Sequence, residues 1–253
     1  MPDASTPLLR KVPEITIAFW ITKVLTTGMG EATSDYLVQT LGPPLAIGIG
    51  AVVFAAALLL QFRVRRYLAG VYWFAVVMVS VFGTMCADVL HVGFCIPYVV
   101  STAFFAVVLA VLFVLWHRVE RTLSIHSIVT RRRELFYWAT VLSTFALGTA
   151  AGDFTATSLH LGFLGSGILF AVVIAIPALA WWKLHLNGVV AFWFAYVTTR
   201  PLGASFADWM AFPGGRGGLG WGTGPVSLGL TLVIVAFVIY LGTSRRLAAW
   251  RSG

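Results

Sequence analysis

One pattern recurs four times along the chain, and it constrains the fold more than any other feature. An aromatic residue and a tryptophan are followed after nine residues by glycine, and after four more by aspartate. The copies occupy residues 19–35, 72–88, 137–153 and 192–208, and they match without a gap. Self-similarity of this kind indicates a repeat architecture. The sequence therefore predicts one structural unit, repeated four times.

The repeated positions divide into three kinds of residue with different expected roles. For the tryptophans we expect an aromatic belt at the membrane–water interface. For the glycines we expect close approach of neighbouring helices, with a backbone hinge as the alternative. The aspartates either form a functional ring or cap neighbouring helix ends structurally. The residues are Trp20, Trp73, Trp138 and Trp193; Gly30, Gly83, Gly148 and Gly203; and Asp35, Asp88, Asp153 and Asp208.

The composition places these repeats in a membrane. The chain is 59% hydrophobic and only 10% charged, whereas soluble domains are about 25% charged. A transmembrane helix needs about 20 apolar residues, and eight segments meet that length. We expect these spans at about residues 15–37, 43–62, 68–91, 95–116, 134–159, 162–182, 187–211 and 225–243.

The basic residues predict the orientation of these spans. All Lys and Arg residues except Lys23, Arg200 and Arg216 flank the spans on one side. The positive-inside rule places that side, and with it both termini, in the cytoplasm. The net charge of +8 is then a topology signal, and its dispersal over short segments argues against nucleic-acid binding. The predicted location is the inner (plasma) membrane, with the lipid bilayer as the main partner.

The expected fold is all-α, a single polytopic membrane domain over residues 1–253. Each unit contains one motif helix and one plainer helix, so all four units share one orientation in the membrane. Such repeats are related by an axis along the membrane normal, which predicts a pseudo-fourfold or twice-twofold bundle. The predicted units are about 12–66, 67–117, 131–184 and 185–246, with a cytoplasmic linker at about 117–133.

The fourfold Trp–Gly–Asp pattern resembles a family of bacterial multi-pass membrane proteins. Members of that family contain four tandem repeats, each with two transmembrane segments and a hallmark tryptophan. The resemblance covers about residues 12–242, and the matching tryptophans are Trp20, Trp73, Trp138 and Trp193. The family is catalogued as a repeat of unknown function, so the resemblance implies an architecture and no activity.

Helical geometry places the aspartates on a polar stripe of each motif helix. At 100° per residue, positions 7, 11 and 15 after the tryptophan lie on one broad face, and the aspartate lies about 22 Å beyond the tryptophan. That face is mostly small or polar, and it also carries Lys23, Glu31 and Arg200. Polar stripes face a bundle interior or a cavity, so we expect the aspartates to converge around a common axis.

These interior charges favour a cation. Five carboxylates and two basic groups would leave a charge of −3 when all are ionised. Intramembrane acids are functional by default, which points to a small-solute or ion transporter or channel with an inorganic cation or proton as its cargo. The alternative is a membrane scaffold or partner subunit in which the motif is structural. The oligomeric state stays open.

The sequence gives little sign of an enzyme, a cofactor or a metal centre. Asp88, His91 and Cys95 have helical spacing that could present ligands to a metal, but Gly93 and Pro97 interrupt that helix. An ordinary interfacial histidine and a buried cysteine are therefore the preferred interpretation. Paired-histidine and nucleophile-elbow motifs are absent from the sequence, so we expect no catalysis and no bound cofactor.

Overall fold

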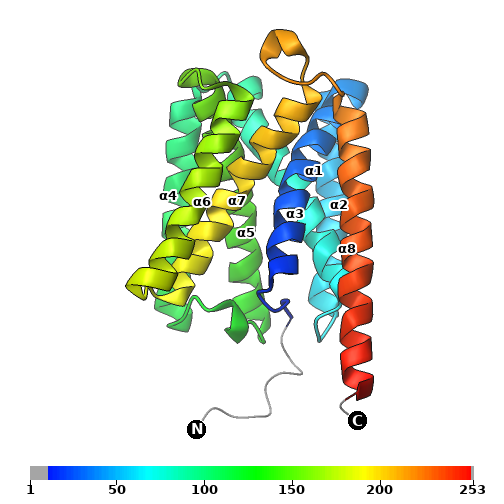
Figure 1. Ribbon diagram of the computed structural model, residues 1–253, viewed down its shortest axis with the longest axis vertical. Coiled ribbons are helices and arrows are strands. Elements are labelled where there is room, and N and C mark those ends of the chain that lie inside the picture. Colours follow the sequence, from blue (N-terminus) through cyan, green and yellow to red (C-terminus); the bar gives the residue numbers. More distant parts are fainter. Residues whose placement is uncertain (1–10, 252–253) are drawn as a thin grey trace.

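The computed structural model describes residues 11–251, although the side chains of residues 243–251 are not described. Eight long α-helices run up and down through this part of the chain (Figure 1). They are α1 (Ile17–Leu41), α2 (Pro43–Arg63), α3 (Ala69–Asp88), α4 (Tyr98–Glu120), α5 (Arg131–Asp153), α6 (Gly162–Leu184), α7 (Gly188–Ala211) and α8 (Thr223–Arg251). The all-α expectation is confirmed, and each predicted span coincides with a helix, although α8 continues eight residues beyond its predicted end at residue 243.

Local sequence signals begin and end several helices. Thr16 caps α1 by accepting a hydrogen bond from the Phe19 amide at 3.2 Å, and Thr130 caps α5 in the same way. Gly42 joins α1 to α2 at φ 79°, a conformation that glycine adopts without strain. Pro43 then begins α2, where its fixed φ suits the first helical turn.

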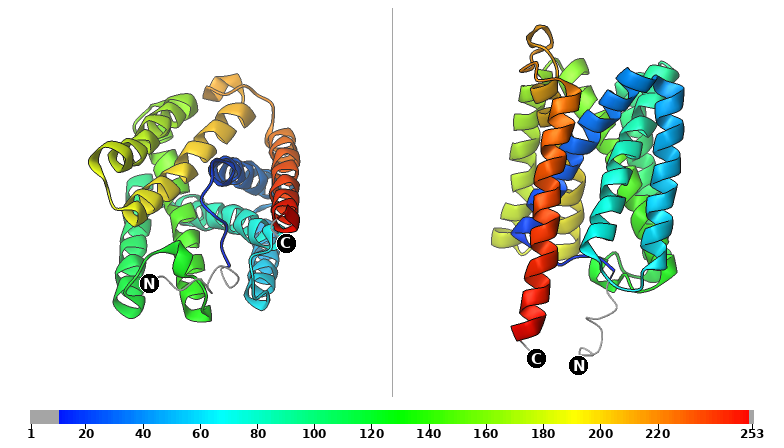
Figure 2. Two further views of the ribbon diagram at one scale, coloured as in Figure 1. Left: turned by 60° about the horizontal axis from the view of Figure 1, so that its bottom comes forward. Right: turned by 90° about the vertical axis from the view of Figure 1, so that its right-hand side faces the viewer.

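The motif helices form a closed inner ring. Along the chain α1 packs on α3, α3 on α5 and α5 on α7, and α7 returns to pack on α1. The other four helices lie outside, and each packs mainly on the motif helix of the following repeat: α2 on α3, α4 on α5, α6 on α7 and α8 on α1. Figure 2 shows α8 outside the bundle next to α1. The contacts are thus cyclic, in agreement with the pseudo-fourfold expectation.

Six of the helices in the described residues are long and apolar enough to cross a membrane. Most residues of α2, α4, α6 and α8 are not buried, whereas more than half of α3 and α5 is. The helices α1 and α7 are equally long but more polar, and they lie in the inner ring. The outer helices therefore provide most of the lipid-facing surface.

The two described ends of the chain lie at the same end of the bundle (Figure 1). That end also holds the α2–α3, α4–α5 and α6–α7 connections, whose basic residues include Arg63, Arg118 and Lys183. Its assignment to the cytoplasm stays a prediction of the positive-inside rule. Arg10 and the side chains of Arg245, Arg246 and Arg251, which also support that prediction, lie outside the described residues.

Candidate functional site: an acidic cavity on the axis of four repeats

The tryptophans join neighbouring repeats at the basic end of the inner ring. The aromatic residue preceding the tryptophan in each repeat packs against the tryptophan of the next repeat. The ring centroids are 5.7 Å apart for Phe19–Trp73, 5.7 Å for Tyr72–Trp138, 6.2 Å for Tyr137–Trp193 and 5.7 Å for Phe192–Trp20. The last pair closes the circle, so the motif aromatics form one continuous inter-repeat contact.

The expected aromatic belt is wrong for three of the tryptophans. Trp73, Trp138 and Trp193 are buried, and Trp20 is half-buried. Trp193 also donates a hydrogen bond to the Leu123 carbonyl at 2.9 Å. The length of the repeat spans suggested an interfacial depth, but burial between repeats decided the direction of these side chains.

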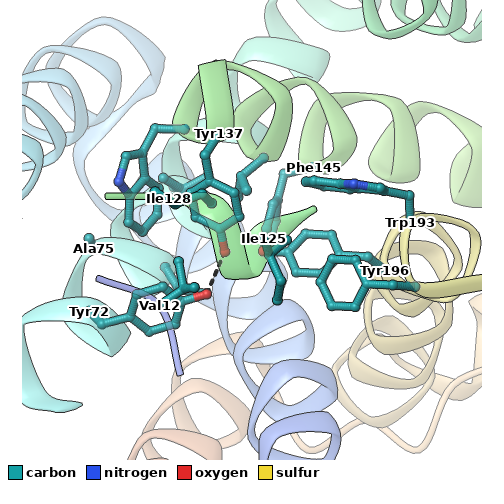
Figure 3. Packing of buried hydrophobic residues seen from close by; sticks show 14 of the residues in the cluster. Val12, Tyr72, Ala75, Ile125, Ile128, Tyr137, Phe145, Trp193 and Tyr196 are labelled. Carbon is teal, nitrogen blue, oxygen red and sulfur yellow. Dashed lines mark hydrogen bonds between the residues drawn. The ribbon is translucent and has the colours of Figure 1, made fainter. Parts of the chain in front are cut away.

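Figure 3 shows the wider aromatic cluster at this end of the axis, where the hydroxyls of Tyr72 and Tyr137 are 2.5 Å apart. Val12, from the segment before α1, joins the cluster together with Ile125 and Ile128 from the α4–α5 connection. All three of these aliphatic side chains are buried. The axis is therefore closed by packed side chains at the basic end.

The glycines are the second cyclic contact. A Cβ added to Gly30 would lie 1.8 Å from Ser80 Oγ, and one added to Gly203 would lie 1.9 Å from Thr27 Oγ1. The equivalent neighbours are Phe145 for Gly83 and Arg200 for Gly148. Each glycine thus faces the residue seven positions after the tryptophan of an adjoining repeat. The close approach of neighbouring helices, rather than a backbone turn, explains why these four positions are glycine.

Arg200 lies at the centre of the ring and bonds to three other motif helices. Its guanidinium donates to Glu31 and to the Thr84 hydroxyl, to the Thr149 hydroxyl at 2.7 Å and to the Thr27 carbonyl at 3.0 Å. Glu31, Thr84 and Thr149 are equivalent positions of the first three repeats. Arg200 is 0% exposed. We call these five residues the Arg200 network.

The four motif aspartates and Glu31 line one cavity of about 760 Å³. The cavity lies at the end of the bundle opposite the basic residues, where the motif helices end and the α1–α2, α3–α4 and α5–α6 connections begin. Its wall also includes Tyr98, Phe163, Phe212 and Arg216. We call it the acidic cavity. Glu31 lines the cavity and also belongs to the Arg200 network, so this network lies at the inner end of the cavity.

The aspartates differ from Glu31 in having no visible partner. Glu31 is paired with Arg200, but within residues 11–242 the four aspartate side chains have no ion pair or hydrogen bond. Asp208 is 6% exposed and still faces the cavity. A buried carboxylate normally needs a compensating partner, and the described residues provide none for Asp208.

The backbone changes at two of the aspartates. Asp88 and Asp153 are the last α-helical residues before π-helical turns at Val89–Gly93 and Phe154–Ser158. Such turns occur frequently at functional sites. The first and fourth repeats continue as α-helix beyond Asp35 and Asp208. The backbone around the cavity therefore differs between repeats, although the packing of the motif helices is nearly fourfold.

Lys23 does not line the acidic cavity. Its ammonium lies 4.1 Å from the ring centre of Phe145 and 4.2 Å from that of Tyr196, and the residue is 0% exposed. No hydrogen-bond partner for this nitrogen is found in the described part of the chain. Lys23 therefore lies deeper on the axis than Arg200 and is separated from the aspartates by the Arg200 network.

The residues suggested as a metal centre do not assemble. His91 Nδ1 is 2.7 Å from the Ile96 carbonyl oxygen, and its ring stacks on Tyr98. Cys95 lies beyond the helix at φ 55° and is exposed. Among the residues with described side chains, no three of the His, Cys, Asp and Glu residues are grouped closely enough to hold a metal ion.

The aromatic part of the cavity wall was not expected from the sequence. Tyr98, Phe163 and Phe212 lie just outside the motif helices, at the ends of neighbouring segments. Arg216 was recognised only as the single basic residue on its side. Because the repeat pattern ends at each aspartate, it gave no signal for these residues.

These features define a polytopic α-helical membrane protein in which four tandem two-helix repeats surround a polar axis with an acidic cavity. The chain belongs to the family described as Repeat of Unknown Function (DUF347), whose model matches residues 18–67, 71–122, 136–186 and 191–246. The resemblance noted from the sequence is thereby confirmed. Comparisons with curated proteins and with solved structures returned no significant match.

Proposed function

We propose that this protein transports a small cation or cationic solute across the membrane, with the acidic cavity as its binding site. The observation that carries the proposal is the buried Asp208 carboxylate, which faces the cavity and has no partner among residues 11–242. Three further aspartates line the same wall. Intramembrane acids of this kind are typical of ion and substrate pathways.

The closed axis favours a transporter over an open channel. Beyond the acidic cavity the axis is filled by the Arg200 network, then by Lys23 between two aromatic rings, and finally by the buried motif aromatics. Two buried basic groups oppose free movement of a cation along this line. Release on the other side would therefore need a rearrangement of the motif helices, as in alternating access.

The positive-inside prediction gives the cavity a direction. Apart from Lys23, Arg200 and Arg216, the basic residues with described side chains lie at the end of the bundle opposite the acidic cavity, so the cavity would open to the outside of the cell. In this state the protein would be open outwards and closed inwards. Accessibility of a cysteine introduced at Phe163 to an impermeant thiol reagent in intact cells, with Cys95 replaced by serine, would test the orientation.

The transport proposal is tested in proteoliposomes with three labelled probes: rubidium, manganese and tetraethylammonium ions. We expect uptake of at least one probe above that of empty liposomes, and a decrease of about tenfold or more in Asp208→Asn, equivalent to about 1.4 kcal/mol. The same substitution at Asp35, Asp88 and Asp153, singly and together, extends the test. Glu14→Gln is the matched control because Glu14 is exposed and lies outside the cavity.

The same variants discriminate transport from a scaffold. If the aspartates only hold the helices together, the asparagine variants lose thermal stability and a transported probe is never found. Asparagine variants that are folded and stable but transport the probe as well as the unaltered protein would remove the aspartates from the mechanism.

A further inference from the structure

The lining of the acidic cavity narrows the class of cation that it suits. We infer that the cavity binds an organic cation, an amine or quaternary ammonium compound with an apolar body, in preference to a bare metal ion. This inference rests on the proposed function and names the substrate class of the same site.

The arrangement of the carboxylates does not suit a bare ion. A small inorganic cation takes several oxygen ligands at about 2.0–2.6 Å. The aspartates instead come from four different helices around the cavity, and no trio of acidic, histidine or cysteine side chains in the described residues is close enough to share one ion. Separated carboxylates can attract a cationic group without coordinating it directly.

The size of the cavity agrees with an organic ligand. Pockets for small molecules have volumes of about 300–1,000 Å³ and mostly apolar walls with a few polar groups. The acidic cavity has about 760 Å³, and much of its wall is aliphatic or aromatic. A dehydrated metal ion would leave nearly all of this wall without contact.

Aromatic rings provide a surface for the body or the charged group of such a ligand. Phe163 and Phe212 stack with ring centres 5.1 Å apart, and Tyr98 contributes a third ring to the wall. Aromatic faces attract ammonium and guanidinium groups by cation–π interaction. Arg216 already lies in this way, with its guanidinium 5.3 Å from the ring centre of Phe212. The rings are therefore better placed to contact the apolar body of the ligand than its positive group, which the aspartates would attract.

The Arg200 network fixes the depth at which the positive group would lie. Glu31 is already paired with Arg200, and the Arg200 guanidinium would repel a second cation at the inner end. The favourable position is then one turn farther out, at the four aspartates, for which the described side chains provide no partner. Asp208 and Phe212 are four residues apart and both line the cavity, so they can contact the charged group and the apolar body of one ligand.

The test measures binding of ethidium, a fluorescent organic cation, to the full chain in lipid nanodiscs, with protein-free nanodiscs subtracted. We expect saturable binding that benzyltrimethylammonium displaces and that manganese or potassium ions at equal ionic strength do not displace. Asp208→Asn should weaken binding at least tenfold, Phe212→Leu should also weaken it, and Glu14→Gln should leave it unchanged. Thermal unfolding of each variant shows whether it is folded.

Two outcomes would overturn the inference. In the first, manganese ions bind in competition with ethidium and depend on Asp208. In the second, neither organic cation binds in a saturable and Asp208-dependent way. If rubidium or manganese uptake still depends on the aspartates, the transport proposal stands and only the substrate class fails. If no probe binds or moves, both fail.

Discussion

The Arg200 guanidinium of α7 donates a hydrogen bond to the Glu31 carboxylate of α1, across 169 positions of sequence. Both residues are buried, and the same guanidinium reaches Thr84 of α3 and Thr149 of α5. One side chain thus connects all four motif helices at the middle of the bundle. The ion pair also explains how α1 and α7, the two more polar motif helices, become neighbours.

Arg200→Met should destabilise the protein by removing the partner of a buried carboxylate. Breaking a buried ion pair on one side typically costs about 3–5 kcal/mol. The double variant Arg200→Met with Glu31→Gln should recover part of the loss, because the uncompensated charge is gone. Resistance to unfolding in mixed detergent micelles measures the effect, with the exposed Arg63→Met as control. An equal loss in the single and double variants would contradict this account.

Gly30→Ala and Gly203→Ala should each lower the free energy of unfolding by about 1–3 kcal/mol, the usual cost of overpacking. In both positions the new methyl group would overlap a hydroxyl and nearby backbone of the adjoining helix. Gly48→Ala in α2 is the matched control, since its methyl group meets nothing within 4 Å. Equal stability of all three variants would show that the repeats do not depend on the close approach.

Lys23→Met should raise the stability of the protein by about 1 kcal/mol or more. A buried polar group without a hydrogen bond typically costs about 1–3 kcal/mol, and cation–π contacts with Phe145 and Tyr196 offset only part of that. Lys183→Met, an exposed control, should change stability by less than about 0.5 kcal/mol. Thermal unfolding in detergent compares the two, and a clear loss of stability in Lys23→Met would argue against an uncompensated ammonium.

Glu134→Gln should loosen the segment before α1. Glu134 is buried and accepts hydrogen bonds from Lys11 Nζ at 2.5 Å and from Gln61 Nε2 at 3.1 Å, which joins this segment to α2 and α5. Without the carboxylate the Lys11 ammonium lacks its counter-charge, and a loss of about 3 kcal/mol is expected.

Hydrogen exchange of residues 11–16 is the measurement for Glu134→Gln, since a loosened segment exchanges faster than the bundle. Glu14→Gln alters an exposed carboxylate within the same segment and should leave exchange nearly unchanged. Slow exchange in both variants would show that the buried pair does not hold the segment in place.

The helices and the convergence of the aspartates followed directly from the sequence. The eight predicted spans each coincide with a helix, although only six of the described helices are long and apolar enough to cross a membrane and α8 runs eight residues beyond its predicted end. Helical periodicity placed the carboxylates on one polar face. The cavity brings Asp35, Asp88, Asp153 and Asp208 together as that face required. The positions of the helices and the shared face of the aspartates both depend on local helical geometry, which can be worked out from a single sequence.

The contacts between repeats could not be predicted in the same way. A tryptophan at interfacial depth can point to lipid or to a neighbouring helix, and only the packing of Tyr72 on Trp138 and its equivalents decides between them. Lys23 and Arg200 share the polar stripe and both lie near the Phe145 ring, yet only Arg200 forms hydrogen bonds with the other motif helices, whereas Lys23 contacts aromatic rings. The buried ion pair between Lys11 and Glu134 joins segments that are far apart in the chain, and no sequence pattern predicts it.

The glycine contact between α7 and α1 has a consequence for the symmetry of the ring. The join between the last repeat and the first is of the same type as the joins between successive repeats, which makes it a heterologous interface that closes after four copies. A two-helix unit with this interface would close a ring after four copies, whether or not the copies were joined in one chain. Within one chain the four units need not be identical. Arg200 lies in the fourth repeat and Glu31 in the first, so the centre of the ring holds one arginine and one glutamate instead of four copies of either.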